Sequence, residues 1–158
     1  MKKIIDLVDR LSLGGACLSA LFMVLIVLVI AVEILLRSVF NTSTLISDEY
    51  SAYFFVGVVL LGLAFTFKED GHIKITLVTS VLGEKGQAVL DVLTTAVAIG
   101  VTSFALYYAS LMVYDSWALG MQADTISETP IYLSQLVIPL GLLLFDLQLG
   151  ARLLKRLI

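Results

Sequence analysis

Two residues of opposite charge, Glu33 and Arg37, stand four positions apart near the end of a long apolar run. This spacing places both on one face of a helix. Inside a membrane an isolated charge is costly, whereas a paired charge is less so. A proton or cation relay would need a carboxyl group that changes its protonation, but a neighbouring guanidinium favours the ionised form. We therefore expect Glu33 and Arg37 to bridge each other or a neighbouring helix in a structural role.

A second charged group, Ser47, Asp48 and Glu49, stands at the start of the next apolar run. Ser47 is expected to cap a helix there, and the positive end of the helix dipole favours both acids. Three further acids are expected on the same side of the membrane: Asp115, Asp124 and Glu128. This acidic surface is either a solvated rim or a docking surface for a basic patch on a soluble partner.

His72 is the only histidine of the chain and Cys17 is the only cysteine. A haem held by two histidines, a histidine-rich zinc site and a thiolate metal cluster are thereby excluded within this chain. His72 lies at the predicted inner membrane boundary, where we expect a capping or interfacial role. No nucleophile, general base and orienting group form a recognisable set, so we predict no enzyme, no catalytic residue, no cofactor and no metal site.

The last apolar run contains Pro139, which frees the backbone carbonyl of Gln135, and Gly141, which adds local freedom. We expect a kink there, with Ser134 or Gln135 satisfying the freed backbone group. Broken helices mark transport sites when they occur as matched pairs in a repeat, but only one break is visible. Helix packing is the better interpretation. Three further glycines are expected to allow close helix approach: Gly57, Gly62 and Gly100.

Membrane-spanning helices are the elements that must position these residues. The 158 residues are 59% hydrophobic and 15% charged, with a mean hydropathy of +1.03, whereas soluble domains carry about 25% charged residues. One span needs about 20 mainly apolar residues. Four runs qualify: about 11–36, 48–67, 88–114 and 131–154. The third holds Asp91 near its start, and the fourth holds Asp146 and Arg152 toward its end. We predict a single all-α membrane domain over residues 1–158.

The positions of lysine and arginine predict the orientation of these spans, because cytoplasmic segments retain such residues. Arg37 alone falls on one side. The other nine fall in the N-terminal segment, the second connection and the tail: Lys2, Lys3, Arg10, Lys68, Lys74, Lys85, Arg152, Lys155 and Arg156. Both termini are therefore predicted in the cytoplasm. The net charge of −3 gives no indication of nucleic acid binding.

Two cytoplasmic segments are amphipathic. In the N-terminal segment 1–10, apolar residues such as Ile4, Leu7 and Val8 recur at helical spacing opposite charged residues. We expect this segment to lie along the membrane surface before the chain turns into the first span. Residues 72–82 repeat the pattern. Ordinary helix flanks explain both segments equally well.

Four strings follow one another along the chain: EILLRSVFN, SDEYSAYFFVGVVLLGLAF, GHIKI and TPIYLSQLVIPLG. In their order and spacing, the chain resembles the small membrane subunit of tripartite ATP-independent periplasmic (TRAP) transporters, the DctQ type. The resemblance touches every predicted span except the third. It rests on these positions: Glu33, Arg37, Asn41, Asp48, Glu49, Tyr53, Gly62, His72, Pro130, Pro139 and Gly141. Two positions depart from the family pattern, because Ile46 stands where a tryptophan is frequent and Thr76 where an acid is common.

The resemblance implies a division of labour. A larger membrane subunit would carry the substrate and sodium sites and move as an elevator, and a periplasmic binding protein would deliver an organic acid. This chain would be a fixed scaffold in the bacterial inner membrane, contacting the large subunit, the binding protein and membrane lipid. The matched residues other than Pro130 are then candidates for structural or partner-interface roles.

Two other function classes stay open at this point. Small self-sufficient four-helix multidrug exporters, which are proton-coupled, also use a glutamate in the first span, although Glu33 lies near an end and beside Arg37. An accessory subunit of a membrane redox complex is the third class, and the single histidine and single cysteine argue against it.

Overall fold

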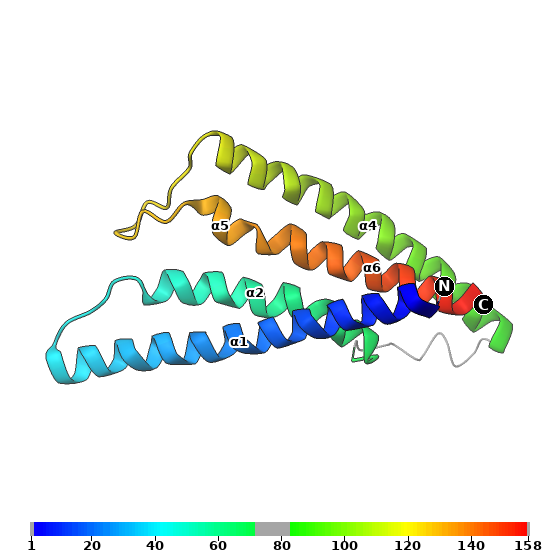
Figure 1. Ribbon diagram of the computed structural model, residues 1–158, viewed down its shortest axis with the longest axis horizontal. Coiled ribbons are helices and arrows are strands. Elements are labelled where there is room, and N and C mark those ends of the chain that lie inside the picture. The colour runs from blue at the N-terminus through cyan, green and yellow to red at the C-terminus, as the bar shows by residue number, and fades with distance from the viewer. Residues whose placement is uncertain (1, 72–82, 158) are drawn as a thin grey trace.

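The computed structural model describes residues 2–71 and 83–157, and helices make up most of them (Figure 1). The helices are α1 (Lys2–Phe40), α2 (Ser47–Lys68), α4 (Glu84–Ala118), α5 (Ile131–Gln135) and α6 (Val137–Leu157). Four stretches are long and apolar enough to cross a membrane: Lys2–Phe40, Ser47–Lys68, Lys85–Ala118 and Ile131–Lys155. The predicted fold class, an all-α protein with four transmembrane helices, is confirmed. The direction in which they cross stays a prediction.

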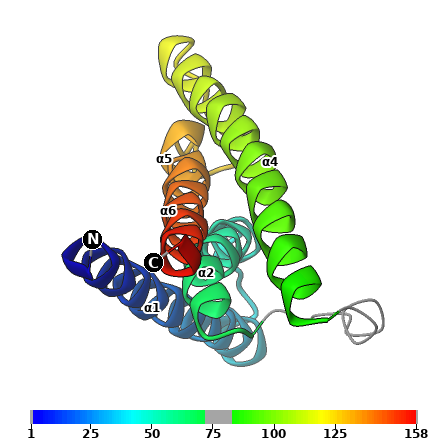
Figure 2. The ribbon, with the colours of Figure 1, turned by 90° about the vertical axis from the view of Figure 1, so that its right-hand side faces the viewer.

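The helices spread apart at one end of the bundle and converge at the other (Figure 1). We call the converging end, where both termini lie, the terminal end, and the opposite end, with residues 41–46 and 119–130, the loop end. α1 and α2 form an antiparallel hairpin, and α6 contacts α1, α2 and α4. α6 therefore lies between the hairpin and α4 (Figure 2).

The N-terminal segment does not turn before the first span, because α1 is one continuous helix from Lys2 to Phe40. Its buried face carries Ile5, Val8 and Ser12, at the spacing of successive helical turns. Ile4 and Leu7 on the other side are more than half exposed. The predicted turn before residue 11 is therefore wrong, and one face of the segment packs inside the bundle. The place of the segment along the membrane surface stays a prediction. The second amphipathic segment, 72–82, lies outside the described residues.

The fourth span is interrupted between α5 and α6, at Leu136. Pro139 has no N–H to donate toward residue 135, and the next bond, from the Leu140 N–H to the Leu136 carbonyl, is 3.4 Å long. The predicted kink is confirmed. The Ser134 hydroxyl donates to the Ile131 carbonyl at 2.8 Å, and so does not satisfy the freed carbonyl of residue 135.

Two glycines bring helix backbones into close contact near the middle of the bundle. A methyl group added at Gly141 of α6 would lie 2.6 Å from the Cβ of Leu60 in α2. One added at Gly15 of α1 would lie 2.7 Å from the carbonyl oxygen of Leu61. Real Cβ atoms are not found so close to backbone, so these positions need glycine. Gly15 was not predicted.

The other glycines differ from one another. Gly57 and Gly62 of α2 face α1. A methyl group added at Gly57 would overlap the Phe22 ring, and one added at Gly62 would lie 3.1 Å from the Ser19 hydroxyl. Close approach at both is confirmed. Gly100 of α4 has open space around its added methyl. The prediction for Gly100 is wrong, because α4 packs against the bundle along another side.

Candidate functional site

The carboxylate of Glu33 is the centre of a polar cluster at the loop end. Glu33 is 6% exposed. Its Oε1 accepts from Arg37 Nε at 2.6 Å and from the Ser43 hydroxyl, and its Oε2 accepts from the Thr44 backbone N–H at 3.0 Å and hydroxyl at 2.5 Å. The expected ion pair is present. Both oxygens are engaged, so the carboxylate holds the loop after α1 in place.

Asn41 ends α1 in a left-handed conformation, with φ of 49°. Asparagine tolerates this region better than most residues. The chain turns back there, and the Thr42 N–H donates to the Leu36 carbonyl at 3.3 Å. Asn41 thus directs the loop toward Glu33. Leu45, with φ of 60°, is the second left-handed residue of the loop.

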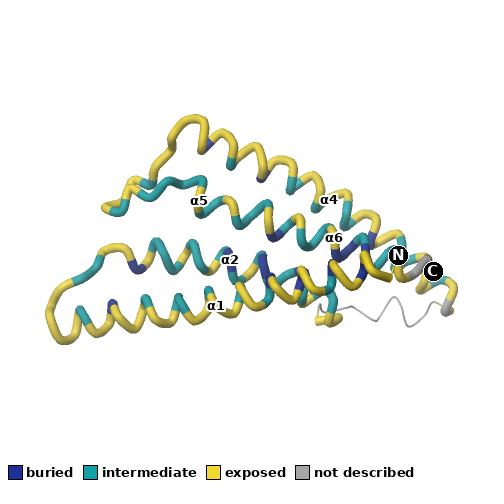
Figure 3. The backbone as a smooth tube through the Cα atoms, in the orientation of Figure 1, coloured by how far each residue is buried: buried dark blue, intermediate teal, exposed yellow. Residues whose placement is uncertain are grey.

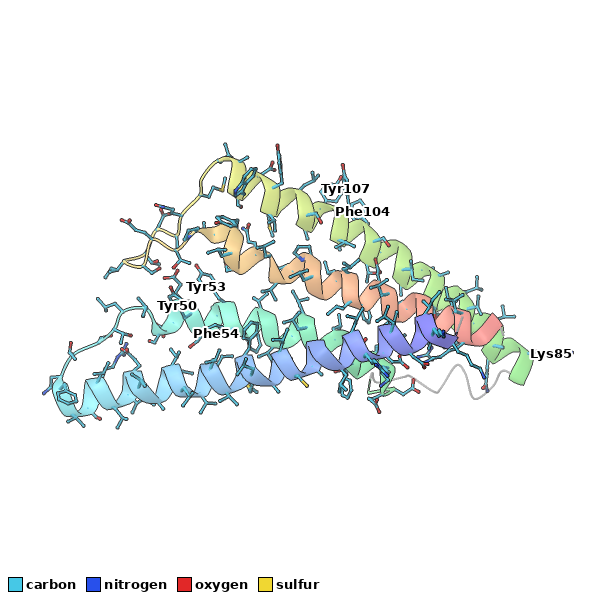
Figure 4. All side chains as sticks on the ribbon, viewed as in Figure 1. Tyr50, Tyr53, Phe54, Lys85, Phe104 and Tyr107 are labelled. Atoms are coloured by element: carbon cyan, nitrogen blue, oxygen red, sulfur yellow. The ribbon has the colours of Figure 1, made fainter. Side chains whose placement is uncertain are left out.

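A second polar cluster surrounds Glu49 in the first turn of α2. Its carboxylate accepts from the Tyr53 hydroxyl at 2.8 Å, from Thr125 at 2.6 Å and from Ser127 at 2.8 Å. Tyr50 shares a further hydrogen bond of 3.2 Å with the Thr129 hydroxyl. Tyr50 and Tyr53 point from α2 toward the loop that precedes α5 (Figure 4). Glu49 therefore fastens the loop 119–130 onto the start of α2.

The start of α2 corrects one prediction. Ser47 is the first residue of the helix and is 4% exposed, and Ile46 occupies the capping position without a side-chain hydrogen bond. The predicted serine cap is wrong, because the helix begins one residue earlier than such a cap requires. Asp48 and Glu49 do lie in the first turn. Asp48 is exposed, as are three other acids at this end: Asp115, Asp124 and Glu128.

At the terminal end, two side chains of α6 reach α1. The Ser12 hydroxyl donates to Gln148 Oε1 at 2.9 Å, and both residues are almost fully buried. Gln148 Nε2 donates to Asp9 at 3.0 Å, and the Lys155 ammonium pairs with the same carboxylate at 3.3 Å. A neutral amide and a hydroxyl satisfy each other inside the bundle, while the charges stay at its edge.

Arg152 of α6 joins two further elements. Its guanidinium bonds to Asp91 of α4 at 2.9 Å and to Asp70, just after α2, at 3.2 Å. It also lies over the Phe67 ring, 5.0 Å from its centroid. In the sequence, Asp91 and Arg152 stand out only as charges within apolar runs. Their opposite signs near span ends on the same predicted side were the available signal for pairing.

Asp146 is a third carboxylate that links helices, and its contacts were not predicted. It lies in the middle of α6 and accepts from the hydroxyls of Thr102 and Ser103 on α4, the latter at 2.8 Å. These hydrogen bonds join the middle of α4 to the middle of α6. The acids within the first, third and fourth spans, Glu33, Asp91 and Asp146, therefore each have a polar partner on another segment.

The remaining predicted positions serve packing or cannot be placed. Gly62, Pro139 and Gly141 are packing and kink positions, as described above. His72 lies outside the described residues. Within residues 2–71 and 83–157, no three histidine, cysteine, aspartate or glutamate side chains gather in a way that could hold a metal ion. The two carboxylate clusters bind loops, and their geometry suits structure.

Comparison with known proteins decides the class of this bundle. The sequence pattern of the DctQ component of tripartite ATP-independent periplasmic transporters matches residues 26–158. The chain belongs to the DctQ family. A similar protein, the TRAP transporter small permease protein of Haemophilus influenzae, is 32% identical over 78 residues. That alignment covers 49% of this chain and 47% of the relative, so the match spans about half the length of the relative.

DctQ membership makes this chain a multi-pass membrane protein of a transporter family. The match begins inside α1 and continues to the end of the chain, so it includes the Glu33 and Glu49 clusters and all of α6. It favours the TRAP hypothesis over an exporter or a redox subunit.

Proposed function

We propose that this chain is the small scaffold subunit of a sodium-coupled TRAP transporter. It would support a larger, elevator-type membrane subunit during uptake of organic acids delivered by a periplasmic binding protein. It would do so as one four-helix domain in a bacterial inner membrane, with both termini in the cytoplasm. DctQ membership supports the proposal.

The unburied apolar surface of the spans is the observation that carries the proposal. In α1 and in α4, only 6% of the most apolar stretch is buried inside the chain, against 22% in the fourth span. Along α4, large exposed side chains recur at helical spacing, among them Val97, Val101 and Phe104. Lipid or a second membrane subunit must cover such faces. A chain that buries so little of itself suits a structural component of a larger assembly.

The use of the polar groups supports a stationary part rather than a moving one. A transport site in a membrane keeps polar groups for its substrate or ion. Here Glu33 and Glu49 hold loops, and Asp146 holds α4 against α6. Each of these carboxylates accepts hydrogen bonds from the chain itself.

Reconstitution of the transporter tests the proposal. The tagged chain, co-expressed with a large multi-span subunit encoded beside it, should co-purify in a fixed ratio. Proteoliposomes with both subunits and the binding protein should take up an organic acid under a sodium gradient, and liposomes that lack the small chain should not. Tight binding of substrate and sodium to the small chain alone would contradict a scaffold role.

A charge-reversal variant locates the interface. The Arg37 side chain is 59% exposed although it pairs with Glu33, so part of its guanidinium faces outward at the loop end. Arg37→Glu should weaken co-purification of the large subunit, and Lys85→Glu, at the terminal end, should not. Equal recovery with both variants would argue against an interface at Arg37.

A further inference from the structure

A pocket of about 290 Å³ opens at the terminal end, where α2 ends beside α6. Its walls are Phe67, Lys68, Asp70, Gln148, Arg152 and Lys155. Small-molecule sites in proteins have volumes of about 300–1,000 Å³. The pocket therefore has room for a small polar group and not for a whole lipid.

Charges of both signs surround this pocket. Its three cations each contact an acid: Lys68 lies 3.5 Å from Glu69, Lys155 lies 3.3 Å from Asp9, and Arg152 pairs with Asp70 and Asp91. Asp70 is the acid among the lining residues, and Glu69, Asp9 and Asp91 lie beside the cations just outside the lining, so four acids neighbour three cations. A purely anionic ligand would place its charge beside carboxylates, whereas a ligand with one positive and one negative group meets a partner for each.

The donors for a phosphate group are in place. An ammonium carries three N–H donors and a guanidinium five. Lys68 pairs with one carboxylate oxygen of Glu69, and Lys155 pairs with one carboxylate oxygen of Asp9. Lys155 is 47% exposed and Lys68 is 27% exposed, and both side chains line the pocket. Asp70, 64% exposed, presents a carboxylate to the same opening.

The position of the pocket along the spans suits a lipid headgroup. Lys68 is the last residue of α2, and Arg152 and Lys155 lie near the end of α6, at the boundary of the apolar spans. Basic pockets between transmembrane helices at this level bind anionic lipid headgroups, and this pocket differs from them because an acid lies beside each of its cations. Phe67 supplies an apolar wall and packs edge-on against Phe145, with ring centroids 5.5 Å apart.

We propose that this pocket binds the headgroup of phosphatidylethanolamine. The phosphate oxygens accept from the ammonium groups of Lys68 and Lys155, and the primary ammonium of the lipid donates to Asp70. Phosphatidylcholine lacks N–H donors for Asp70, and phosphatidylglycerol lacks the positive charge. The inference depends on the membrane location of the chain and not on its assembly with other subunits.

Native mass spectrometry of the purified full chain tests the proposal. In detergent with equal amounts of phosphatidylethanolamine, phosphatidylglycerol and phosphatidylcholine, the chain should retain phosphatidylethanolamine about fivefold more tightly, the effect of one charge contact at a membrane surface. Equal retention of the three lipids, or preference for phosphatidylglycerol, would overturn it. So would displacement of the lipid by millimolar inorganic phosphate, which would assign the pocket to free phosphate.

Three variants separate binding from folding. Lys155→Gln should weaken retention of phosphatidylethanolamine about fivefold, and Lys85→Gln, an exposed cation of α4, should leave it unchanged. Asp70→Asn should abolish the preference over phosphatidylglycerol. Asparagine adopts the left-handed backbone of position 70, where φ is 53°, so this variant keeps the backbone conformation although it weakens the contact with Arg152. If Lys155→Gln and Lys85→Gln gave equal retention, the pocket would not be the lipid site.

Discussion

The two ends of the bundle are held together by different kinds of contact. At the terminal end, side chains of one helix bond directly to those of another, and α6 takes part each time: Gln148 with Ser12, and Arg152 with Asp91. At the loop end, carboxylates on helices accept hydrogen bonds from loops instead. The first arrangement fixes helices to one another, whereas the second fixes each loop to one helix.

The burial pattern shows the same contrast. Most of the buried hydrophobic residues lie toward the terminal end, where dark segments gather in Figure 3; they include Ile5, Val8, Leu149 and Ala151. Toward the loop end, α1 and α4 diverge (Figure 1). The helices are therefore packed together at the terminal end and spread apart at the loop end, where their apolar faces need other partners. If the chain is a scaffold, we expect the terminal end to be its rigid part and the loop end to supply its contact surface.

Loss of Arg152 should produce the largest effect on stability, because it joins α6 to both α4 and the end of α2. Arg152→Gln should lower the free energy of unfolding by about 2 kcal/mol, since the pair is only partly shielded from water. Its side chain is 19% exposed and that of Asp91 is 24% exposed. Reversible unfolding in mixed micelles measures the loss, with Lys85→Gln as the unaffected control.

A double-mutant cycle isolates the Arg152–Asp91 contact from the other partners of each residue. The combination of Arg152→Gln with Asp91→Asn should be less destabilised than the sum of the single variants. Strictly additive losses would contradict a direct pair, and the terminal end would then owe its rigidity to apolar packing.

A substitution at the contact of α6 with α2 should cause the next largest loss in the free energy of unfolding. Gly141→Ala places a methyl 2.6 Å from Leu60, and overpacking of this kind costs about 1–3 kcal/mol, partly offset by the better helix propensity of alanine. We expect a net loss of about 1 kcal/mol. Gly150→Ala in the same helix meets open space and should be neutral or stabilising. Equal thermal midpoints for both variants would mean that α6 shifts freely against α2.

The spans were predictable from sequence because hydropathy summed over about 20 residues does not depend on which helix packs where. The prediction of 48–67 differs from α2, Ser47–Lys68, by one residue at each end. The prediction of 11–36 fell short of α1, Lys2–Phe40. The bonds of Asp9 and Ser12 to Gln148 hold the first turns of this helix against α6, and no local pattern encodes such partners.

The candidate sites were predictable only where the contact is local. Glu33 and Arg37 stand one helical turn apart, so their pair follows from spacing alone. The donors Ser43 and Thr44 reach Glu33 because the loop turns back through left-handed residues, which the sequence does not specify uniquely. Ser12 and Gln148 lie 136 positions apart. One sequence contains no signal that joins such distant residues.

Loss of the Glu33 carboxylate should speed amide hydrogen exchange at the loop end and leave exchange at the terminal end unchanged. In Glu33→Gln, the amide nitrogen has no lone pair for the hydroxyl and N–H donors of the loop, so residues 41–46 should exchange their amide hydrogens several-fold faster. Hydrogen exchange with mass spectrometry measures this. Arg37→Gln removes one of the four hydrogen bonds that Glu33 accepts and should produce a smaller change. Faster exchange around Asp9 and Gln148 would show that the two ends are coupled.

The smallest effect is expected at Glu49, because its loop is also held by the bond between Tyr50 and Thr129. Glu49→Gln should speed amide exchange in residues 119–130 and leave the thermal midpoint almost unchanged, since the affected bonds join a loop to a helix end. Asp48→Asn is the matched control: it removes an exposed acid from the same first turn, and the loop should keep its protection. Equal exchange in the two variants would mean that loss of negative charge, and not the hydrogen bonds to Thr125 and Ser127, governs the loop.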